Sequence, residues 1–290
     1  MVMKQRVVIC GGSGFIGTAL RRQLESAGYD VVIISRNPNP DELNWDQLPS
    51  ALEGALAVVN LAGRSVNCIF TQANKKEILA SRVETTAKVA GAIDHCIHKP
   101  KKWINASATG FYGDRGDEAL HESSQAGTGF LPDICTAWEQ ACLNSDAETN
   151  KYVIRIGVVL SAQGGVLAKL IPYVKAFLGG SASTGNQWLS WIHLSDLARL
   201  VQHVIEQDTG PIVSGSTPNP VQNRDLMTWF RKAYGRPWSP PIPALILKVN
   251  GRLIGPDASL ALDSYRVVPA LLPDFQFIYP TLDSINRSDL

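Results

Sequence analysis

The chain has 290 residues, and its 27 Lys and Arg nearly balance its 26 Asp and Glu, which leaves a formal net charge of +1. This balance argues against nucleic-acid and membrane-surface binding, because both usually require an excess of basic residues. With 45% hydrophobic residues, the chain can form one large domain or a domain with a smaller lobe. Its five cysteines include no C-x-x-C pair, which favours reduced cytosolic thiols over a disulfide framework or a zinc ribbon.

The apolar segments of the chain are short. Only residues 1–5 precede the first one, which leaves no room for the charged and hydrophobic regions of a signal peptide. Later runs, such as residues 152–160, are far shorter than the roughly 20 residues that cross a bilayer. The sequence therefore predicts a soluble, cytoplasmic protein.

Strand-like and helix-like segments alternate along the first two thirds of the chain. The predicted strands are residues 6–10, 30–35, 57–62, 102–106 and 152–160, the last long enough for the middle of a sheet. The predicted helices are residues 15–27, 72–96, 129–144 and 166–178. This order predicts an α/β fold in which right-handed βαβ units build a doubly wound parallel sheet that is covered on both faces.

The composition changes near residue 179, where residues 179–185 form a loop of small side chains. Most of the prolines follow from Pro211 onward, and the apolar runs become shorter. We expect a first domain over residues 1–178 and a smaller, mixed lobe over residues 179–290. Residues 190–215 again contain a strand-to-helix unit, and we expect them to contribute to the first domain.

Glycines directly after the first strand give the strongest chemical signal. Gly11, Gly14 and Gly17 have the spacing G-x-x-G-x-x-G between a strand and a helix. Such glycines allow a tight turn, a close approach to a pyrophosphate and close packing of helix on sheet. The free N–H groups and the positive dipole end of the helix would face the phosphates. We predict a dinucleotide site formed by Gly11, Gly12, Ser13, Gly14, Phe15, Ile16 and Gly17; the alternative is a glycine-rich connection without a ligand.

The end of the second strand indicates which dinucleotide binds. An NAD site usually has an acidic residue there, which accepts a hydrogen bond from the ribose 2′-hydroxyl. This chain has Ser35 and Arg36 at that place, and no acidic residue before Asp41. A hydroxyl and a guanidinium suit a 2′-phosphate, so the sequence predicts NADP(H). The alternative is that Arg36 is a solvated surface arginine.

The end of the third strand is rich in small residues. We predict that Asn60, Leu61, Ala62 and Gly63 let the backbone approach the adenine-side ribose and the diphosphate. A small-residue strand end that packs on a helix explains these residues equally well.

These motifs, with the run 107–113 (S-A-T-G-F-Y-G), resemble the extended short-chain dehydrogenase/reductases. More narrowly, the chain resembles the atypical, YfcH-like branch of the epimerase family. This narrower resemblance lies in Ser81-Arg82, Trp138-Glu139, the run 155–160 and the run 190–196. About the last 45 residues resemble the C-terminal domain of unknown function of that branch. The resemblance implies a Rossmann fold, an NADP-type cofactor and a substrate lobe in the C-terminal third.

The resemblance also implies where a reaction would take place. In the wider superfamily a Ser or Thr orients a carbonyl or carbinol, and a Tyr four residues before a Lys transfers the proton, because the lysine lowers the pKa of the phenol. Ser107 matches the serine, and the resemblance suggests Thr109, two residues on, as its helper. With Glu139 placed on the family's glutamate, Leu131 and Cys135 stand where the Tyr and the Lys belong. The usual pair is therefore absent, as it is in the branch as a whole.

Without that pair, three proton donors are considered: water, Tyr112 and His193. Core packing explains Tyr112 as well, and a structural histidine explains His193. We assign no metal site, because a polar turn accounts for His95, Cys96 and His98.

The sequence thus leaves two functions open. The first is an NADP(H)-dependent oxidoreductase or epimerase-like enzyme that acts on a small carbonyl or sugar-like substrate through Ser107, Thr109 and Tyr112. The alternative is an NADP(H)-binding sensor or interaction module without turnover. The resemblance also implies a homodimer formed through helices 72–96 and 129–144.

Overall fold

A parallel sheet forms the centre of the computed structural model, which describes residues 4–253, 256–286 and 289. Its strand order is β2-β1-β3-β4-β6-β10, and every pairing in it is parallel. The strands are β1 (Arg6–Cys10), β2 (Asp30–Ile34), β3 (Ala57–Asn60), β4 (Lys102–Ala108), β6 (Asn150–Ile156) and β10 (Ile212–Gly215). The strand order reverses between β1 and β3, as in doubly wound folds, and the predicted Rossmann-type α/β class is confirmed.

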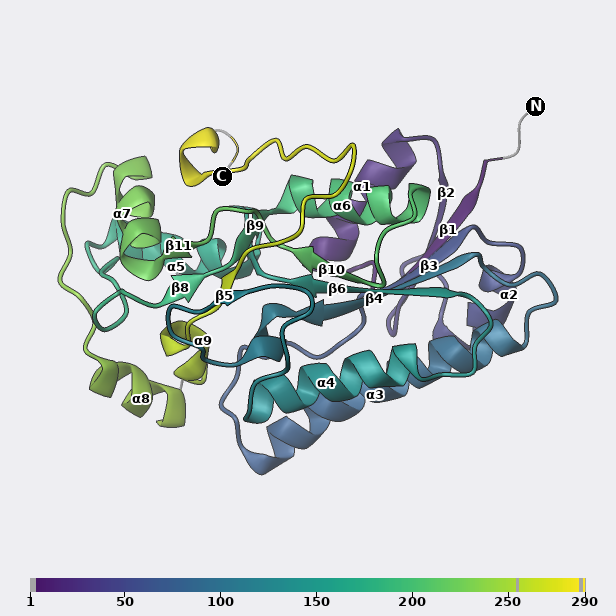
Figure 1. Cartoon of the computed structure of the whole chain (residues 1–290), viewed down its shortest axis with the longest axis horizontal. Coiled ribbons are helices and arrows are strands. Elements are labelled where there is room, and N and C mark those ends of the chain that lie inside the picture. Colours follow the sequence, from purple (N-terminus) through teal and green to yellow (C-terminus); the bar gives the residue numbers. More distant parts are fainter. Residues whose placement is uncertain (1–3, 254–255, 287–288, 290) are drawn as a thin grey trace.

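Helices cover both faces of this sheet (Figure 1). On one face α1 (Phe15–Ser26) packs against α6 (Leu194–Glu206). On the other face lie α2 (Leu48–Leu52), α3 (Gln72–Asp94) and α4 (Phe130–Leu143), preceded by the short 3-10 helix η1 (Trp45–Gln47). Helices α1, α3 and α4 start and stop within two residues of the predicted bounds, whereas the predicted helix 166–178 ends at Lys175, three residues early.

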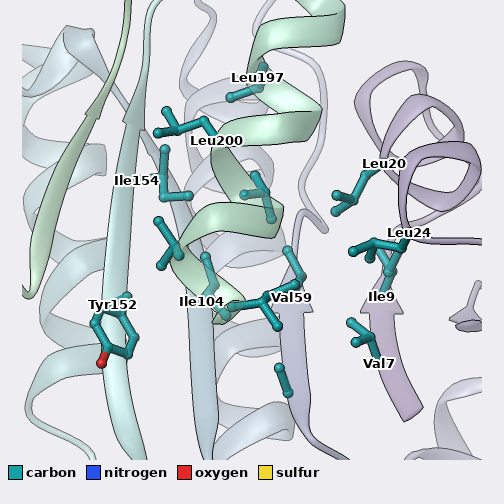
Figure 2. Packing of buried hydrophobic residues seen from close by; sticks show 14 of the residues in the cluster. Val7, Ile9, Leu20, Leu24, Val59, Ile104, Tyr152, Ile154, Leu197 and Leu200 are labelled. Carbon is teal, nitrogen blue, oxygen red and sulfur yellow. The ribbon is translucent and has the colours of Figure 1, made fainter. Parts of the chain in front are cut away.

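The side chains of β1 show how one strand serves two cores. Val7 and Ile9 pack with Leu20 and Leu24 of α1 in the cluster that Figure 2 shows. Their neighbours Val8 and Cys10 belong to the cluster on the opposite face. Successive side chains of a strand point to opposite faces, so a continuous apolar run is what a strand between two helix layers requires. Each fully buried aliphatic side chain contributes about 1.5–3 kcal/mol, which fixes the strand between its helices.

The predicted strand 152–160 is wrong in one respect, because the structure divides it at Gly157. β6 ends at Ile156, and β7 (Val158–Leu160) pairs instead with β9 (Trp191–His193) in a separate two-stranded sheet. The N–H of Gly157 donates to the carbonyl of Gly215 at 2.9 Å. A Cβ at Gly157 would lie 2.5 Å from the carbonyl oxygen of Ser190, so only glycine allows this change of sheet. β6 itself lies between β4 and β10, one strand from the edge.

The remaining elements form a smaller, mixed part of the molecule (Figure 1, left). Its helices are α5 (Gly165–Lys175), α7 (Asn223–Ala233), α8 (Ala244–Leu253) and α9 (Ser259–Leu262). Its strands pair as β8 (Trp188–Leu189) with β11 (Val221–Gln222) and β5 (Ala119–Leu120) with β12 (Arg266–Val267). The 3-10 helices η2 (Thr109–Tyr112) and η3 (Leu282–Ser284) complete the described elements. The division at residue 178 stays a prediction.

The chain returns to the Rossmann part near its end. The backbone N–H groups of Ile278 and Tyr279 donate to the carboxylate of Asp196 at 2.9 and 2.8 Å. Asp196, in the first turn of α6, is fully buried and also pairs with Arg199 at 3.1 Å. The described helices include none that is both long enough and apolar enough to cross a membrane.

Candidate functional site

The turn between β1 and α1 leaves no space for a side chain at two of its glycines. Gly11 has a φ of +78°, and a Cβ on it would lie 3.0 Å from the backbone of Ala62. A Cβ on Gly17 would lie 2.5 Å from the Cα of Gly12. The N–H of Gly14 donates to the carbonyl of Gly11 at 3.2 Å and closes the turn. The start of α1 is therefore held directly against the ends of β1 and β3.

The start of α1 has no side-chain cap. Gly14 is the N-cap residue, and the first turn of the helix contains no acidic residue. The first N–H groups of a helix have no partner within the helix, and the dipole makes this end positive. A phosphate group is the natural ligand of such a helix start. The glycine turn therefore fits a diphosphate.

A cavity of about 640 Å³ opens beside this turn, between the ends of β2 and β3 and one face of α3. Among the residues that the sequence predicts for the cofactor, those lining the cavity are Gly11, Ser13, Gly14, Ser35, Arg36, Leu61, Ala62 and Gly63. The other residues predicted for the cofactor do not line the cavity. Phe15 packs on Gly164, where a Cβ would lie 2.5 Å from its ring, and Ile16 packs against the core.

Arg36 lies at the rim of the cavity with its charge unmatched. It is exposed and makes no hydrogen bond or ion pair with the residues that the structure describes. Asp41, the first acidic residue after β2, is already paired with Arg21 at 2.7 Å, and that hydrogen bond lowers the pKa of its carboxyl. The hydroxyls of Ser13 and Ser35, which line the same cavity as Arg36, lie 3.3 Å apart. A free guanidinium with two hydroxyls fits a 2′-phosphate.

Asn60 has a different role from the one that the sequence predicts. Its side chain is fully buried, and its amide donates to Asn105 Oδ1 at 2.8 Å and to Thr86 Oγ1 at 3.2 Å. Its own Oδ1 accepts the N–H of Ala62 at 3.2 Å. Asn60 therefore does not line the cavity itself but holds the backbone of Ala62, which does.

Ser107, near the end of β4, belongs to a buried ionic network. Its hydroxyl donates to Glu139 Oε1 of α4 at 2.6 Å. The Glu139 carboxylate also accepts two hydrogen bonds from Arg155 of β6, from Nε and Nη2, both at 2.9 Å. All three residues are at most 4% exposed. A bidentate pair of this kind is strong and fixes the geometry of both side chains.

Tyr112 forms the far end of the same network. Its hydroxyl accepts a hydrogen bond from Arg155 Nη1 at 3.1 Å, and the guanidinium carbon lies 3.5 Å from the centroid of the Phe111 ring. Tyr112 is fully buried, and burial raises the pKa of its phenol more than the hydrogen bond from Arg155 lowers it. The structure therefore places Tyr112 in the core with its hydroxyl bonded to Arg155, and its role as a proton donor stays a prediction.

Thr109 and Cys135 lie beside this network. Thr109 is 5% exposed, and its hydroxyl makes no hydrogen bond to the described residues. Cys135 stands where the superfamily has its lysine, and burial raises the pKa of its thiol to about 11. A neutral thiol cannot lower the pKa of a phenol as a lysine does. Cys135 therefore provides no substitute for that residue.

His193 lies apart from these residues, beside a second cavity of about 440 Å³ between α1 and α6. One ring nitrogen accepts the N–H of Ser195 at 3.3 Å and so caps α6. Burial lowers the pKa of its imidazole. His193 thus has a structural role in the described part of the chain.

Few features of the sequence indicate which residues bond to Ser107. Glu139 and Arg155 belong to motifs of the family, but these motifs do not show that the two residues meet Ser107. A physical signal was nevertheless present, because Arg155 interrupts the apolar run 152–160 of a strand that is buried on both faces. A charge at such a position requires a partner.

Known proteins resemble the chain over nearly its whole length. The model of the NAD dependent epimerase/dehydratase family matches residues 7–214. The epimerase family protein SDR39U1 of Homo sapiens is 32% identical over 286 residues, which cover 96% of this chain and 97% of the human protein. The chloroplastic homologue of SDR39U1 from Arabidopsis thaliana is 30% identical over 303 residues, which cover 97% of this chain and 86% of the plant protein.

A solved structure agrees in fold. The crystal structure of human SDR39U1 (isoform 2) with NADPH matches with a TM-score of 0.92 and 30% identity, over 98% of this chain and 99% of that one. Because one relative is chloroplastic, the cytoplasmic location stays a prediction, as does the YfcH-like branch. The glycine turn, the sheet order and these matches together show that the chain belongs to the NAD dependent epimerase/dehydratase family.

Proposed function

We propose that the protein is an NADP(H)-dependent oxidoreductase or epimerase-like enzyme that acts on a small carbonyl or sugar-like substrate. The observation that carries the proposal is the position of the Ser107–Glu139 hydrogen bond. It lies near the carboxyl end of β4, and only β3 separates β4 from β1, whose end forms the glycine turn. In such sheets, ligands bind outside the carboxyl ends of the strands, at the point where the strand order reverses.

The cofactor half of the proposal rests mainly on two cationic or donor groups, the start of α1 and Arg36, which have no side-chain partner among the described residues. The N–H groups at the start of α1 would hold the diphosphate. Arg36, with the hydroxyls of Ser13 and Ser35, would hold the 2′-phosphate. NADP(H), when bound, supplies or accepts a hydride. The NADPH of the human relative's crystal structure supports this assignment.

The reactive half rests on how Ser107 is bonded. Because the hydroxyl of Ser107 donates its hydrogen to Glu139, its oxygen is available as an acceptor. A substrate hydroxyl would give its proton to Ser107 Oγ while the proton of Ser107 passes to Glu139 Oε1. The reverse transfer returns the proton to a carbonyl oxygen. Arg155 holds the Glu139 carboxylate in place, and Thr109, whose hydroxyl has no partner among the described residues, would donate to the same substrate oxygen. This relay would replace the Tyr and Lys pair.

A screen of aldehydes, ketones and nucleotide sugars, followed by NADPH absorbance in both directions, tests the proposal. For a substrate that turns over, we expect Ser107→Ala to lower kcat/KM by about 100-fold or more, because positioned proton transfer contributes that much. Ser216→Ala is the matched control. Ser216 is fully buried, and its hydroxyl has no partner among the described residues. A substrate whose turnover survives Ser107→Ala would exclude the relay.

One observation favours the second candidate function, an NADP(H)-binding sensor. Ser107, Thr109 and Tyr112 are only 3%, 5% and 0% exposed. The sensor requires NADPH binding without turnover in the whole screen. NADPH binding that changes the protein's conformation, with no substrate of the screen converted, would therefore favour the sensor over the enzyme.

A further inference from the structure

Arg82 of α3 is a half-buried cation with few partners. Its Nη1 donates to the carbonyl oxygens of Arg64 and Ile78, at 2.9 and 3.1 Å. A guanidinium has five N–H donors. The donors on Nη2 and Nε have no acceptor among the residues that the structure describes. Nor does any described carboxylate form an ion pair with it, whereas the neighbouring Arg64 is paired with Glu77.

The surroundings of Arg82 make this state costly. Its guanidinium carbon lies 4.9 Å from the centroid of the Trp138 ring. A Cβ on Gly63 would be 3.4 Å from its Cγ and Cζ atoms. Burial lowers the pKa of Arg82, because the charged form has lost part of its water. Buried charges in proteins are normally paired, so a bound anion would offset the lost hydration of the guanidinium.

Arg82 lies between the two halves of the site. Gly63, which it contacts, and Ser81, which precedes it, both line the cofactor cavity. On its other side, Trp138 directly precedes Glu139, the residue to which Ser107 donates. The charge of Arg82 also acts on the thiol of Cys135 and opposes the rise in its pKa. Ser107 acts on the same thiol, so Arg82 and Ser107 both lie near Cys135, and a molecule bound next to Ser107 would lie near Arg82.

We propose that Arg82 binds an anionic group of the substrate, a carboxylate or a phosphate. The cofactor diphosphate already has its own donors at the start of α1, so the guanidinium is available to the second ligand. The substrate class then narrows to small carbonyl compounds or alcohols that carry a negative charge. The reaction named here rests on the proposed function, but the binding of an anion can be measured without turnover.

The test uses the full-length, nucleotide-free protein, first saturated with NADP+ and then titrated with inorganic phosphate and with acetate. We expect the wild-type complex to bind at least one of the two anions in calorimetry. Arg82→Gln should weaken that binding about 10-fold or more, the value for charged hydrogen bonds. Arg82→Lys, which keeps the charge but not the planar fork, should bind with intermediate affinity. The Kd of NADPH should stay within about twofold in both variants, because the diphosphate has other donors.

Arg236→Gln is the matched control. Arg236 is also stacked on an aromatic ring, 4.4 Å from the centroid of Phe177, and donates to a carbonyl oxygen, that of Lys175, at 3.0 Å. It also forms no ion pair with a described carboxylate, but it lies in the smaller part of the molecule, outside the cofactor cavity. Arg236→Gln should bind the anions as the wild type does.

Three results would overturn the proposal. The wild-type complex binds neither anion, or Arg82→Gln binds them as tightly as the wild type, or Arg82→Gln weakens NADPH about 10-fold, which would assign the cation to the cofactor. If Arg82→Gln does not fold, Arg82→Lys decides, and unchanged anion affinity then contradicts the proposal. Failure of the wild type to bind NADPH would contradict the proposed function instead, and so the two failures are distinct.

Discussion

The two ends of the site differ in how their polar groups are satisfied. At the cofactor end, the start of α1 has no cap, and Arg36 has no partner in the described part of the chain. At the reactive end, Ser107, Glu139 and Arg155 satisfy one another inside the core. The first region keeps donors for a ligand, while the second keeps a fixed geometry. Removing an unpaired group at the first should therefore change binding, and breaking the ion pair at the second should change stability.

The largest effect is expected from Arg155→Met. This change leaves the Glu139 carboxylate buried without its guanidinium, and breaking a buried pair in this way costs about 3–5 kcal/mol. Urea unfolding of the variant and of the wild type measures the loss of unfolding free energy. The double variant Glu139→Gln with Arg155→Met should recover part of it, because no unpaired charge remains. A loss below about 1 kcal/mol would place the pair among weak surface bridges.

The next largest effect is expected from Arg36→Gln. Charged hydrogen bonds to the 2′-phosphate contribute about 1.5–3 kcal/mol, so NADPH should bind about 10- to 100-fold more weakly. NADH, which has no such phosphate, should bind as before. Arg22→Gln, which removes a likewise exposed charge from α1, is the control for general electrostatics. Equal losses for both nucleotides in Arg36→Gln would show that Arg36 does not contact the 2′-phosphate.

Gly17→Ala tests the close packing of the turn. Its Cβ would lie 2.5 Å from the backbone of Gly12, and overpacking of this kind costs about 1–3 kcal/mol. We expect lower stability in urea together with weaker NADPH binding, because the turn must shift. In Gly91→Ala, the matched control, the new Cβ meets no atom within 4 Å, and stability should rise by about 0.4–1 kcal/mol. Equal stabilities for the two variants would contradict this description of the turn.

His193→Asn should have the smallest effect, and only on the pH dependence of stability. Burial lowers the pKa of His193 below its ordinary value of 6.5, so below that pH the unfolded chain binds more protons than the folded one. The free energy of unfolding should therefore fall as the pH falls through 6.5 toward the folded pKa. Asn can still cap α6 but does not titrate, so the fall should be shallower in the variant. If the free energy of unfolding falls equally steeply in both proteins between about pH 7 and pH 5, the lowered pKa of His193 is contradicted.

The cofactor end was largely predictable because its signals are local. The apolar run of β1, the glycine triplet and Arg36 all lie within the first 36 residues, and each acts through backbone geometry or an unpaired charge. Asn60 shows the limit of this reasoning, because a polar residue at a strand end looks the same whether it lines a cavity or supports it. Only its burial distinguishes the two.

The reactive end was much less predictable because its contacts join separate elements. Ser107, Glu139 and Arg155 come from β4, α4 and β6, and nothing in their spacing shows that they meet. The change of sheet at Gly157 depends in the same way on the carbonyl of Ser190. Such features follow from tertiary packing, which periodicity and motif spacing do not contain.

The most direct test of the central claim is calorimetric titration of freshly purified, nucleotide-free protein with NADPH and with NADH. The uncapped start of α1 and Arg36, which has no partner among the described residues, predict saturable binding of NADPH, about tenfold or more tighter than that of NADH. Flat traces with NADPH at millimolar excess, or equal affinity for the two nucleotides, would contradict the account.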